Sequence, residues 1–214
     1  MLLSMRMTKN PVTVTPDMSV QGAEALMKQE KVHRLPVLDE NKRLVGVISE
    51  KDILKATPSP ATTLSAYEMN YLVGKMTVRQ IMKKNPKTVS PDTTIEEAAR
   101  MMVEEDLSSI CVVDGVKLLG IVSKSDLFKM LLEMLGSRQY GVRVEFVVDD
   151  RPGVIATIST ALAANGYNIV AFGTFAGEDS STSLCTLKIQ GGSIKAVKTI
   201  MKPLVREIID VREF

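Results

Sequence analysis

The segment that decides the fold is Leu44–Asp52, LVGVISEKD, because the chain repeats it as Leu118–Asp126, LLGIVSKSD. Two further pairs of matching segments precede these, with an offset of 75 residues: Asn10–Asp17 with Asn85–Asp92, and Val32–Asp39 with Leu107–Asp114. A one-residue deletion near Asp114 reduces the offset to 74 at Gly46 and Gly120. A repeat of this length, with its parts in the same order, indicates one supersecondary unit that is duplicated within the chain.

Both copies end in the pattern Gly-apolar-apolar-Ser-x-x-Asp, from Gly46 to Asp52 and from Gly120 to Asp126. Two such units resemble a tandem pair of cystathionine-β-synthase (CBS) domains over roughly residues 1–135. The resemblance implies a pseudo-symmetric pair that binds an adenine nucleotide (ATP, ADP or AMP) in the clefts between its halves. S-adenosylmethionine and NAD remain alternative ligands.

The composition limits the class of protein. Of the 214 residues, 45% are hydrophobic and 24% are charged, so the chain can bury a core and is long enough for two regions. The net charge is +2 without a dense run of Lys and Arg, which disfavours a nucleic-acid partner. No apolar run approaches the ~18 residues that cross a bilayer, and the N-terminus lacks a signal-peptide core. We therefore expect a cytoplasmic, soluble protein without membrane contact.

The residue types that carry catalysis and metal binding are scarce. Cys111 and Cys185 lie in apolar runs without CxxC spacing, which predicts buried free thiols in a reducing compartment rather than a disulfide or a metal site. His33 is the only histidine, and the chain has neither a Gly-x-Ser-x-Gly elbow nor a Walker lysine motif. We therefore expect no catalytic residues and no metal.

Each copy is predicted to contain a strand, a helix, two strands and a second helix. In the second copy Thr94 and Glu97 form a capping-box pattern at the start of the first helix. Apolar runs then predict strands at Leu35–Leu38, Leu44–Ile48, Ile110–Val113 and Leu118–Val122. The second helix of each copy begins at Ser49 or Ser123.

These patterns divide the chain into a first CBS repeat at 1–57, a linking helix at 58–78 and a second repeat at 79–135. The linking helix either covers a cleft or pairs with another subunit, and the sequence leaves both open. A different pattern occupies residues 140–214, where strand and helix signals follow the order β-α-β-β-α-β. The predicted fold class is therefore α/β (α+β), a CBS pair followed by a ferredoxin-like domain.

The C-terminal domain has the turn Asp149-Asp150-Arg151-Pro152-Gly153 after its first strand. With this turn it resembles an ACT domain, a small effector-sensing module. The resemblance implies an effector loop in which Asp150, Gly153, Asn168 and Ile169 lie near a small amino acid or a similar ligand. The turn also has an ordinary explanation, with Pro in the first turn of a helix. A CBS pair followed by an ACT domain resembles the acetoin-utilization regulatory proteins of bacteria.

Ser49-x-x-Asp52 and Ser123-x-x-Asp126 have two interpretations. Ser followed three residues later by an acid is the pattern of an N-terminal capping box. In the CBS resemblance, the carboxylates of Asp52 and Asp126 accept the two hydroxyls of a ribose, while the serine and the helix-start amides face a phosphate. Capping does not exclude the second role.

The resemblance also assigns phosphate contacts to the residues that open the first long strand of each copy. These are His33 and Arg34 in the first copy, with Ser108 and Ser109 at the matching positions in the second. Since Arg34 would reach across the pseudo-twofold axis, we expect the Asp126 cleft to bind phosphorylated ligands more tightly than the Asp52 cleft. The residues expected to line the base are Thr13, Val14, Pro36, Thr88, Val89 and Ile110.

Three functions remain open from the sequence. The first is a regulatory sensor with adenine nucleotide in the CBS pair, in which the ACT domain senses a metabolite or dimerises. The second is an enzyme of unusual type, and the third is an oligomerisation scaffold with vestigial sites. Because both modules are sheets covered on one side, we also predict a homodimer.

Overall fold

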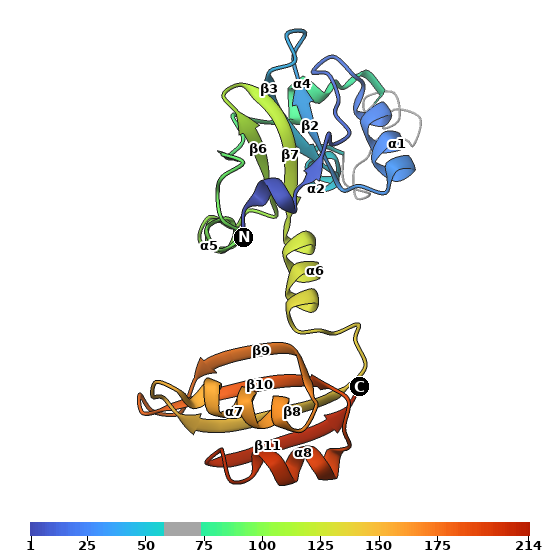
Figure 1. Cartoon of the computed structure of the whole chain (residues 1–214). Coiled ribbons are helices and arrows are strands. Elements are labelled where there is room, and N and C mark those ends of the chain that lie inside the picture. Colours follow the sequence, from blue (N-terminus) through green and yellow to red (C-terminus); the bar gives the residue numbers. More distant parts are fainter. Residues whose placement is uncertain (58–73) are drawn as a thin grey trace. The chain divides into compact units, whose positions relative to one another are not determined.

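The computed structural model describes residues 1–57 and 74–214, which form two compact units, Met1–Leu127 and Phe128–Phe214 (Figure 1). Most of the predicted linking helix, at 58–73, lies outside the described residues. Among the described residues, no helix is both long and apolar enough to span a membrane.

The first unit contains two small sheets. One has the strand order β2-β3-β4, with β2 at Arg34–Leu38, β3 at Leu44–Ser49 and β4 at Lys83–Lys84. The other has the order β1-β7-β6-β5, with β1 at Thr8–Lys9, β5 at Thr88–Val89, β6 at Ser109–Asp114 and β7 at Lys117–Ser123. The helices are η1 (Leu3–Met5), α1 (Val20–Glu30), α2 (Glu50–Ala56), α4 (Val78–Ile81), α5 (Ile95–Glu104) and α6 (Lys124–Met134), the last of which leads into the second unit.

The predicted strand pairs and helices of both repeats are present. The apolar spacing of α1 predicts one face with Val20, Ala23, Leu26 and Met27; all of these are buried except Leu26, which is partly buried against the same cluster. Thr94 and Glu97 form the expected capping box of α5. The apolar spacing of α5 (Ile95, Ala98, Ala99, Met102 and Val103) also predicts a buried Val103, but this residue is 77% exposed. The first strand of the first copy, which the sequence places at Thr13–Val14, is reduced to a single parallel bridge between Val14 and Val37.

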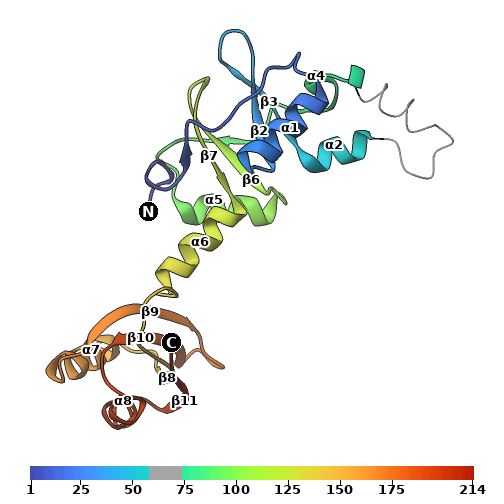
Figure 2. The same cartoon turned by 90° about the vertical axis from the view of Figure 1, so that its right-hand side faces the viewer.

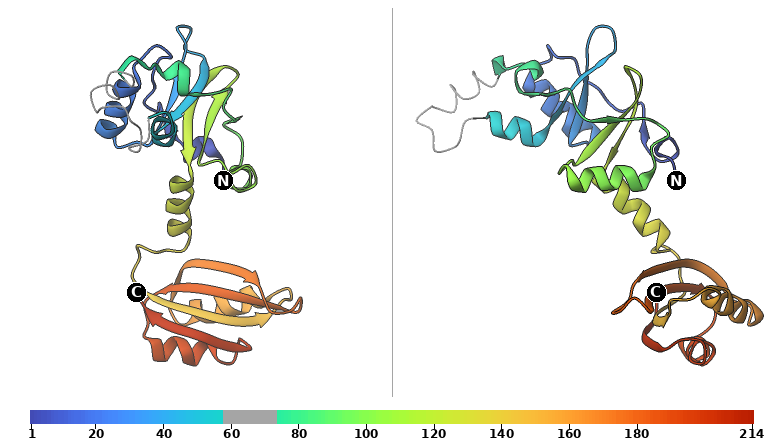
Figure 3. Two further views of the ribbon diagram at one scale, coloured as in Figure 1. Left: turned by 180° about the vertical axis from the view of Figure 1, so that it is seen from behind. Right: turned by 90° about the vertical axis from the view of Figure 1, so that its left-hand side faces the viewer.

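The two repeats exchange their leading segments, an arrangement that was not predicted. Strand β1, from the first repeat, pairs with β7 of the second, and β4, from the second repeat, pairs with β3 of the first. The cores follow the same exchange. Leu3 is buried among second-repeat side chains, and Val78, which directly precedes the second repeat, is buried among first-repeat side chains. The N-terminus accordingly lies beside α5 in every view (Figures 2 and 3). The repeat in sequence is therefore not the unit of packing.

The strand exchange explains why both copies of the repeated segment contain a glycine, Gly46 in the first and Gly120 in the second. A Cβ atom added to Gly120 would lie 2.8 Å from the carbonyl oxygen of Thr8, and one added to Gly46 would lie 3.1 Å from that of Lys83. Contacts under 3.0 Å are essentially never tolerated, so Gly120 lets the exchanged strand approach β7.

The second unit has the predicted order β8 (Val142–Asp149), α7 (Val154–Ala164), β9 (Asn168–Ala176), β10 (Thr182–Gln190), α8 (Ile194–Met201) and β11 (Glu207–Glu213). Its sheet is antiparallel with the strand order β11-β8-β10-β9. This is the ferredoxin-like arrangement.

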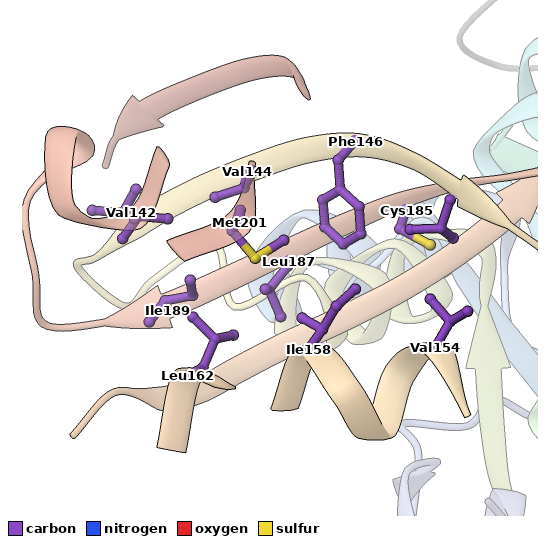
Figure 4. Close-up of a cluster of buried hydrophobic side chains, with 12 residues drawn as sticks. Val142, Val144, Phe146, Val154, Ile158, Leu162, Cys185, Leu187, Ile189 and Met201 are labelled. Atoms are coloured by element: carbon purple, nitrogen blue, oxygen red, sulfur yellow. The ribbon is translucent and has the colours of Figure 1, made fainter. Parts of the chain in front are cut away.

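Both helices of this unit cover one face of the sheet. Along β8 every second residue is buried, from Val142 to Val148, because successive side chains point to opposite faces. Figure 4 shows Val144 and Phe146 in one core with Ile158 of α7 and Met201 of α8. The intervening residues of β8 therefore form the face opposite to the helices.

Candidate functional site

The Ser-x-x-Asp segments form matching structures in the two repeats. At the start of α2, the amide of Ser49 donates to Oδ2 of Asp52 at 3.0 Å, and the Ser49 hydroxyl donates to the same oxygen. At the start of α6, the amide and hydroxyl of Ser123 donate to Oδ2 of Asp126 at 2.9 and 2.6 Å. The capping interpretation is therefore confirmed for both aspartates.

The capping hydrogen bonds all go to one carboxylate oxygen, Oδ2, of each aspartate, and the carboxylates lie near the surface. Asp52 and Asp126 are both partly exposed, while Ser49 is 7% exposed. A carboxylate oxygen can accept more than one hydrogen bond, so the geometry is compatible with a second partner such as a ribose hydroxyl.

Arg34 connects the two repeats. Its Nη1 donates to the hydroxyl of Ser109 at 3.1 Å, and this bond joins residues that are 75 positions apart. Arg34 lies opposite Ser49 in the β2–β3 register, and Ser109 lies opposite Ser123 in the β6–β7 register. The bond therefore links the first residues of β2 and β6, each of which pairs with one of the two capping serines.

The guanidinium of Arg34 is half-buried. Burial lowers its pKa, and the nearby carboxylate of Asp52 raises it in part compensation. Arginine stays protonated under these conditions, so Arg34 is a partly desolvated cation with a neutral hydroxyl as its hydrogen-bond acceptor. Such a cation is suited to bind an anion.

His33 and Ser108 are placed differently from Arg34 and Ser109. Both are exposed, and each main-chain carbonyl accepts a hydrogen bond from the first residue of a helix, Glu50 for His33 and Lys124 for Ser108. Nδ1 of His33 also lies 2.9 Å from Oε2 of Glu50. An anionic partner is thus already beside His33. Glu50 was missed as a neighbour of this site, although it directly follows Ser49.

The residues expected to line the base fall into two groups. Val14, Pro36 and Ile110 are buried, Val14 and Ile110 within hydrophobic clusters, so their side chains support the fold. Val14 is held by its amide, which donates to the carbonyl of Pro36 at 3.0 Å. The others are accessible at least in part: Thr13, Thr88 and Val89.

The ACT residues predicted for an effector do not form one cluster within the domain. Asp150 donates its amide to Ser181, next to the first residue of β10, and Gly153 begins α7 with φ of 88°. Asn168 and Ile169 pair with Gln190 and Ile189 at the other end of β10. At ~3.3 Å per residue, these ends lie more than ~20 Å apart. One small molecule therefore cannot touch all four in a single domain.

In the described part of the chain, no group of three or more His, Cys, Asp or Glu side chains could hold a metal ion. Both cysteines are free and buried, as predicted.

Comparison with known proteins now places these features in a family. The CBS domain model matches residues 3–59 and 78–133, and the ACT domain model matches residues 142–204. The chain belongs to the CBS-domain family and carries a tandem CBS pair followed by an ACT domain.

Relatives match mainly through the CBS pair. An uncharacterized protein of Methanocaldococcus jannaschii is 33% identical over 146 residues, which cover 67% of this chain and 35% of that protein. A CBS domain-containing protein of Dictyostelium discoideum is 30% identical over 135 residues, covering 63% of this chain and 93% of the relative. The chain thus spans about a third of the first of these relatives.

Solved structures of CBS pairs have the same fold. CBSX2, in a crystal structure in complex with AMP, is 31% identical with a TM-score of 0.51, covering 61% of this chain and 96% of that one. A Vibrio cholerae protein described as a putative acetoin utilization protein (AcuB) is 24% identical with a TM-score of 0.54, and the match covers 64% of this chain and 95% of that one. This match shows a similar fold. The CBS pair of MJ0100, in complex with 5′-methylthioadenosine and S-adenosylmethionine, is 26% identical with a TM-score of 0.51, covering 61% and 99%.

Proposed function

We propose that this chain is a non-catalytic regulatory sensor that binds an adenine nucleotide in its CBS pair. The observation that carries the proposal is the bond between Arg34 and Ser109, because it puts a half-buried cation at the second repeat's strand opening. With this cation, and with one accessible threonine and one carboxylate from each repeat, the CBS pair offers partners for phosphate, base and ribose.

Each group has a role in the proposed Asp126 cleft. The carboxylate of Asp126 accepts the ribose hydroxyls, the Ser123 hydroxyl and the first amides of α6 face a phosphate, and Thr88 borders the base. Arg34 exchanges its neutral acceptor, Ser109, for a phosphate oxygen, which is the stronger charge-assisted bond. We assign Ser108 and Ser109 to the ligand of the Asp52 cleft, although the Asp52 carboxylate also lies near Arg34 and raises its pKa. On this assignment the Asp52 cleft binds phosphorylated ligands more weakly.

The complexes of the relatives support an adenosine-containing ligand. AMP in CBSX2 and S-adenosylmethionine with 5′-methylthioadenosine in MJ0100 share the adenosine moiety. They differ in the charge at the 5′ position, where a phosphate is anionic and a sulfonium is cationic. A cation at Arg34 favours a phosphate over a sulfonium, and we therefore propose ATP, ADP or AMP rather than S-adenosylmethionine. NAD also carries phosphates at this position, so the thermal shifts below distinguish it from the mononucleotides.

In this proposal the ACT domain, at 140–214, acts as a metabolite sensor or a dimerisation module in a cytoplasmic homodimer. The order of domains, which resembles that of acetoin-utilization regulatory proteins, suggests acetoin utilization as the regulated pathway. Regulation would arise because a nucleotide binds one arrangement of the CBS pair more tightly than another.

Thermal shifts with ATP, ADP, AMP, S-adenosylmethionine and NAD test the proposal. A nucleotide at about 100 times its dissociation constant should stabilise the folded chain by ~2.7 kcal/mol. A scaffold with vestigial sites predicts no shift with any ligand, and an enzyme predicts product in the same mixtures.

A further inference from the structure

The ACT domain has a cavity of about 160 Å³ on the face of its sheet that α7 and α8 leave uncovered. Most of the lining comes from outward positions of three strands and from Leu135, which directly follows α6, while Phe172 also borders the core. The residues of β9 that border the cavity include Ala171 and Gly173, whose small size leaves the space open.

Lys188 is the unusual group in this cavity. Its side chain belongs to β10 on the uncovered face, and yet the residue is 4% exposed. Nζ donates to the main-chain carbonyl of Gly136 at 2.9 Å and lies 5.0 Å from the centroid of the Phe214 ring. Within residues 1–57 and 74–214, no carboxylate lies within ion-pair distance of this ammonium. Burial of a cation without a counter-ion is costly, and an ammonium has three donors.

The other charges at the cavity compensate each other. Arg143 lies 2.9 Å from the carboxylate of Glu145 and 3.6 Å from that of Asp210. Asp210 is in turn paired with Arg212, at 2.6 Å. Among the charged residues that line the cavity, Arg143 and Glu145 therefore compensate each other, and Lys188 provides the remaining positive charge. Thr186, two residues earlier on the same face of β10 and 8% exposed, adds a hydroxyl.

The size of the cavity limits the ligand. A cavity of about 150 Å³ holds benzene, so this one holds about six non-hydrogen atoms. Leu135, Ala171 and Phe175 provide apolar contacts for the part of the ligand that carries no charge.

We propose that this cavity binds a small monocarboxylate, with the carboxylate on Lys188 and Thr186 and a short apolar chain against Leu135. The site lies apart from Asp150, Gly153, Asn168 and Ile169, which are absent from its lining. Since Lys188 holds the carbonyl of Gly136 just after α6, a carboxylate that competes for its ammonium changes how the end of α6 is held. This site does not depend on nucleotide binding in the CBS pair.

The probe is isobutyrate, which has six non-hydrogen atoms, and its matched control is the neutral isostere isobutyramide. Amide NMR spectra of the full chain are recorded during titration with each at constant ionic strength. Isobutyrate should shift the amides of β9 and β10 around Gly173 and Lys188, with a dissociation constant on the order of 1 mM, within the ceiling for so small a ligand. Equal shifts with isobutyramide, or none with isobutyrate, would overturn the proposal.

Three variants locate the site. Lys188→Met removes the charge and should weaken isobutyrate binding at least ~10-fold, as loss of a charge-assisted bond does. Gly173→Val fills the cavity without removing the charge, so it should also weaken isobutyrate binding at least ~10-fold. The variant should fold, because a Cβ at this position meets its nearest neighbour, in Thr186, at an ordinary 3.4 Å. Lys195→Met, at an exposed position on α8, is the control and should bind like the parent. If Lys188→Met does not fold, Gly173→Val decides, and unchanged binding in it refutes the site.

Discussion

Arg34 and Ser109 occupy equivalent positions in the two CBS repeats, and Nη1 of Arg34 donates to Oγ of Ser109 at 3.1 Å. The pseudo-twofold relation of the repeats thus brings unlike side chains together, a cation from one and a hydroxyl from the other. The two strand openings therefore differ chemically, even though Asp52 and Asp126 accept the same hydrogen bonds from Ser49 and Ser123.

Replacement of Arg34 should affect phosphate recognition in particular. Arg34→Met should weaken ATP binding by about tenfold, the equivalent of ~1.4 kcal/mol for one charge-assisted contact. Adenosine, which lacks phosphate, should lose little affinity. Calorimetric titration of both ligands measures the difference, with Arg79→Met as the control because Arg79 forms an exposed ion pair with Asp17. An equal loss for adenosine would show that Arg34 supports the fold and not the phosphate.

Gly120 should not tolerate a side chain. Gly120→Ala places a Cβ 2.8 Å from the Thr8 carbonyl, so the exchanged strand β1 must move. We expect a loss of ~1–3 kcal/mol in the free energy of unfolding, as for other overpacked sites. Denaturant unfolding measures this loss. Gly74→Ala is the control, because its Cβ would meet Gln21 at 3.7 Å.

Leu3 should stabilise the second repeat, although it belongs to the first. It is 0% exposed and packs in the cluster of Ala98, Met102 and Ile110. Leu3→Ala should therefore cost about 2–5 kcal/mol, while Met5→Ala, at a 70% exposed position, should cost little. Equal stability of the two variants in denaturant unfolding would contradict the strand exchange.

The sequence predicts the local elements well because their signals are local. Ser49 and Ser123 mark helix starts, and the alternation from Val142 to Val148 marks a strand with one buried face. Alignment of the two repeats identifies Arg34 and the aspartates of the two capping boxes. The hydrogen bond of Arg34 to Ser109 depends on how the two repeats pack and is seen only in the structure.

The features that were missed depend on long-range contacts. The exchange of β1 and β4 leaves no signal in the sequence, because strands of two residues have no periodicity. The cavity near Lys188 depends on the register of β9 against β10 and on the position of Gly136. No local pattern distinguishes this buried lysine from an exposed one on the same strand.

Burial of Cys111 should make the free energy of unfolding depend on pH in the alkaline range. Burial raises the pKa of its thiol to about 12, from an ordinary 9.0. Since the folded state favours the protonated thiol, the stability is unaffected below the ordinary value and falls as the pH rises from about 9 towards 12. Unfolding measured at about pH 8 and pH 10.5 should show a smaller decrease for Cys111→Ala than for the parent. An identical decrease would contradict the burial of this thiol.

The inequality of the two nucleotide clefts is the central claim, and calorimetric titration of ATP against Asp126→Ala and Asp52→Ala tests it most directly. Both substitutions remove the carboxylate of a capping box, while Ser49 and Ser123 stay in place as the N-cap residues, and each should cost a similar ~0.5–2 kcal/mol in stability. Thr94→Ala, which removes the cap of α5, controls for that loss. We predict that Asp126→Ala abolishes the high-affinity event and that Asp52→Ala and Thr94→Ala leave it intact. Loss of that event in Asp52→Ala, with Asp126→Ala unaffected, would contradict the account.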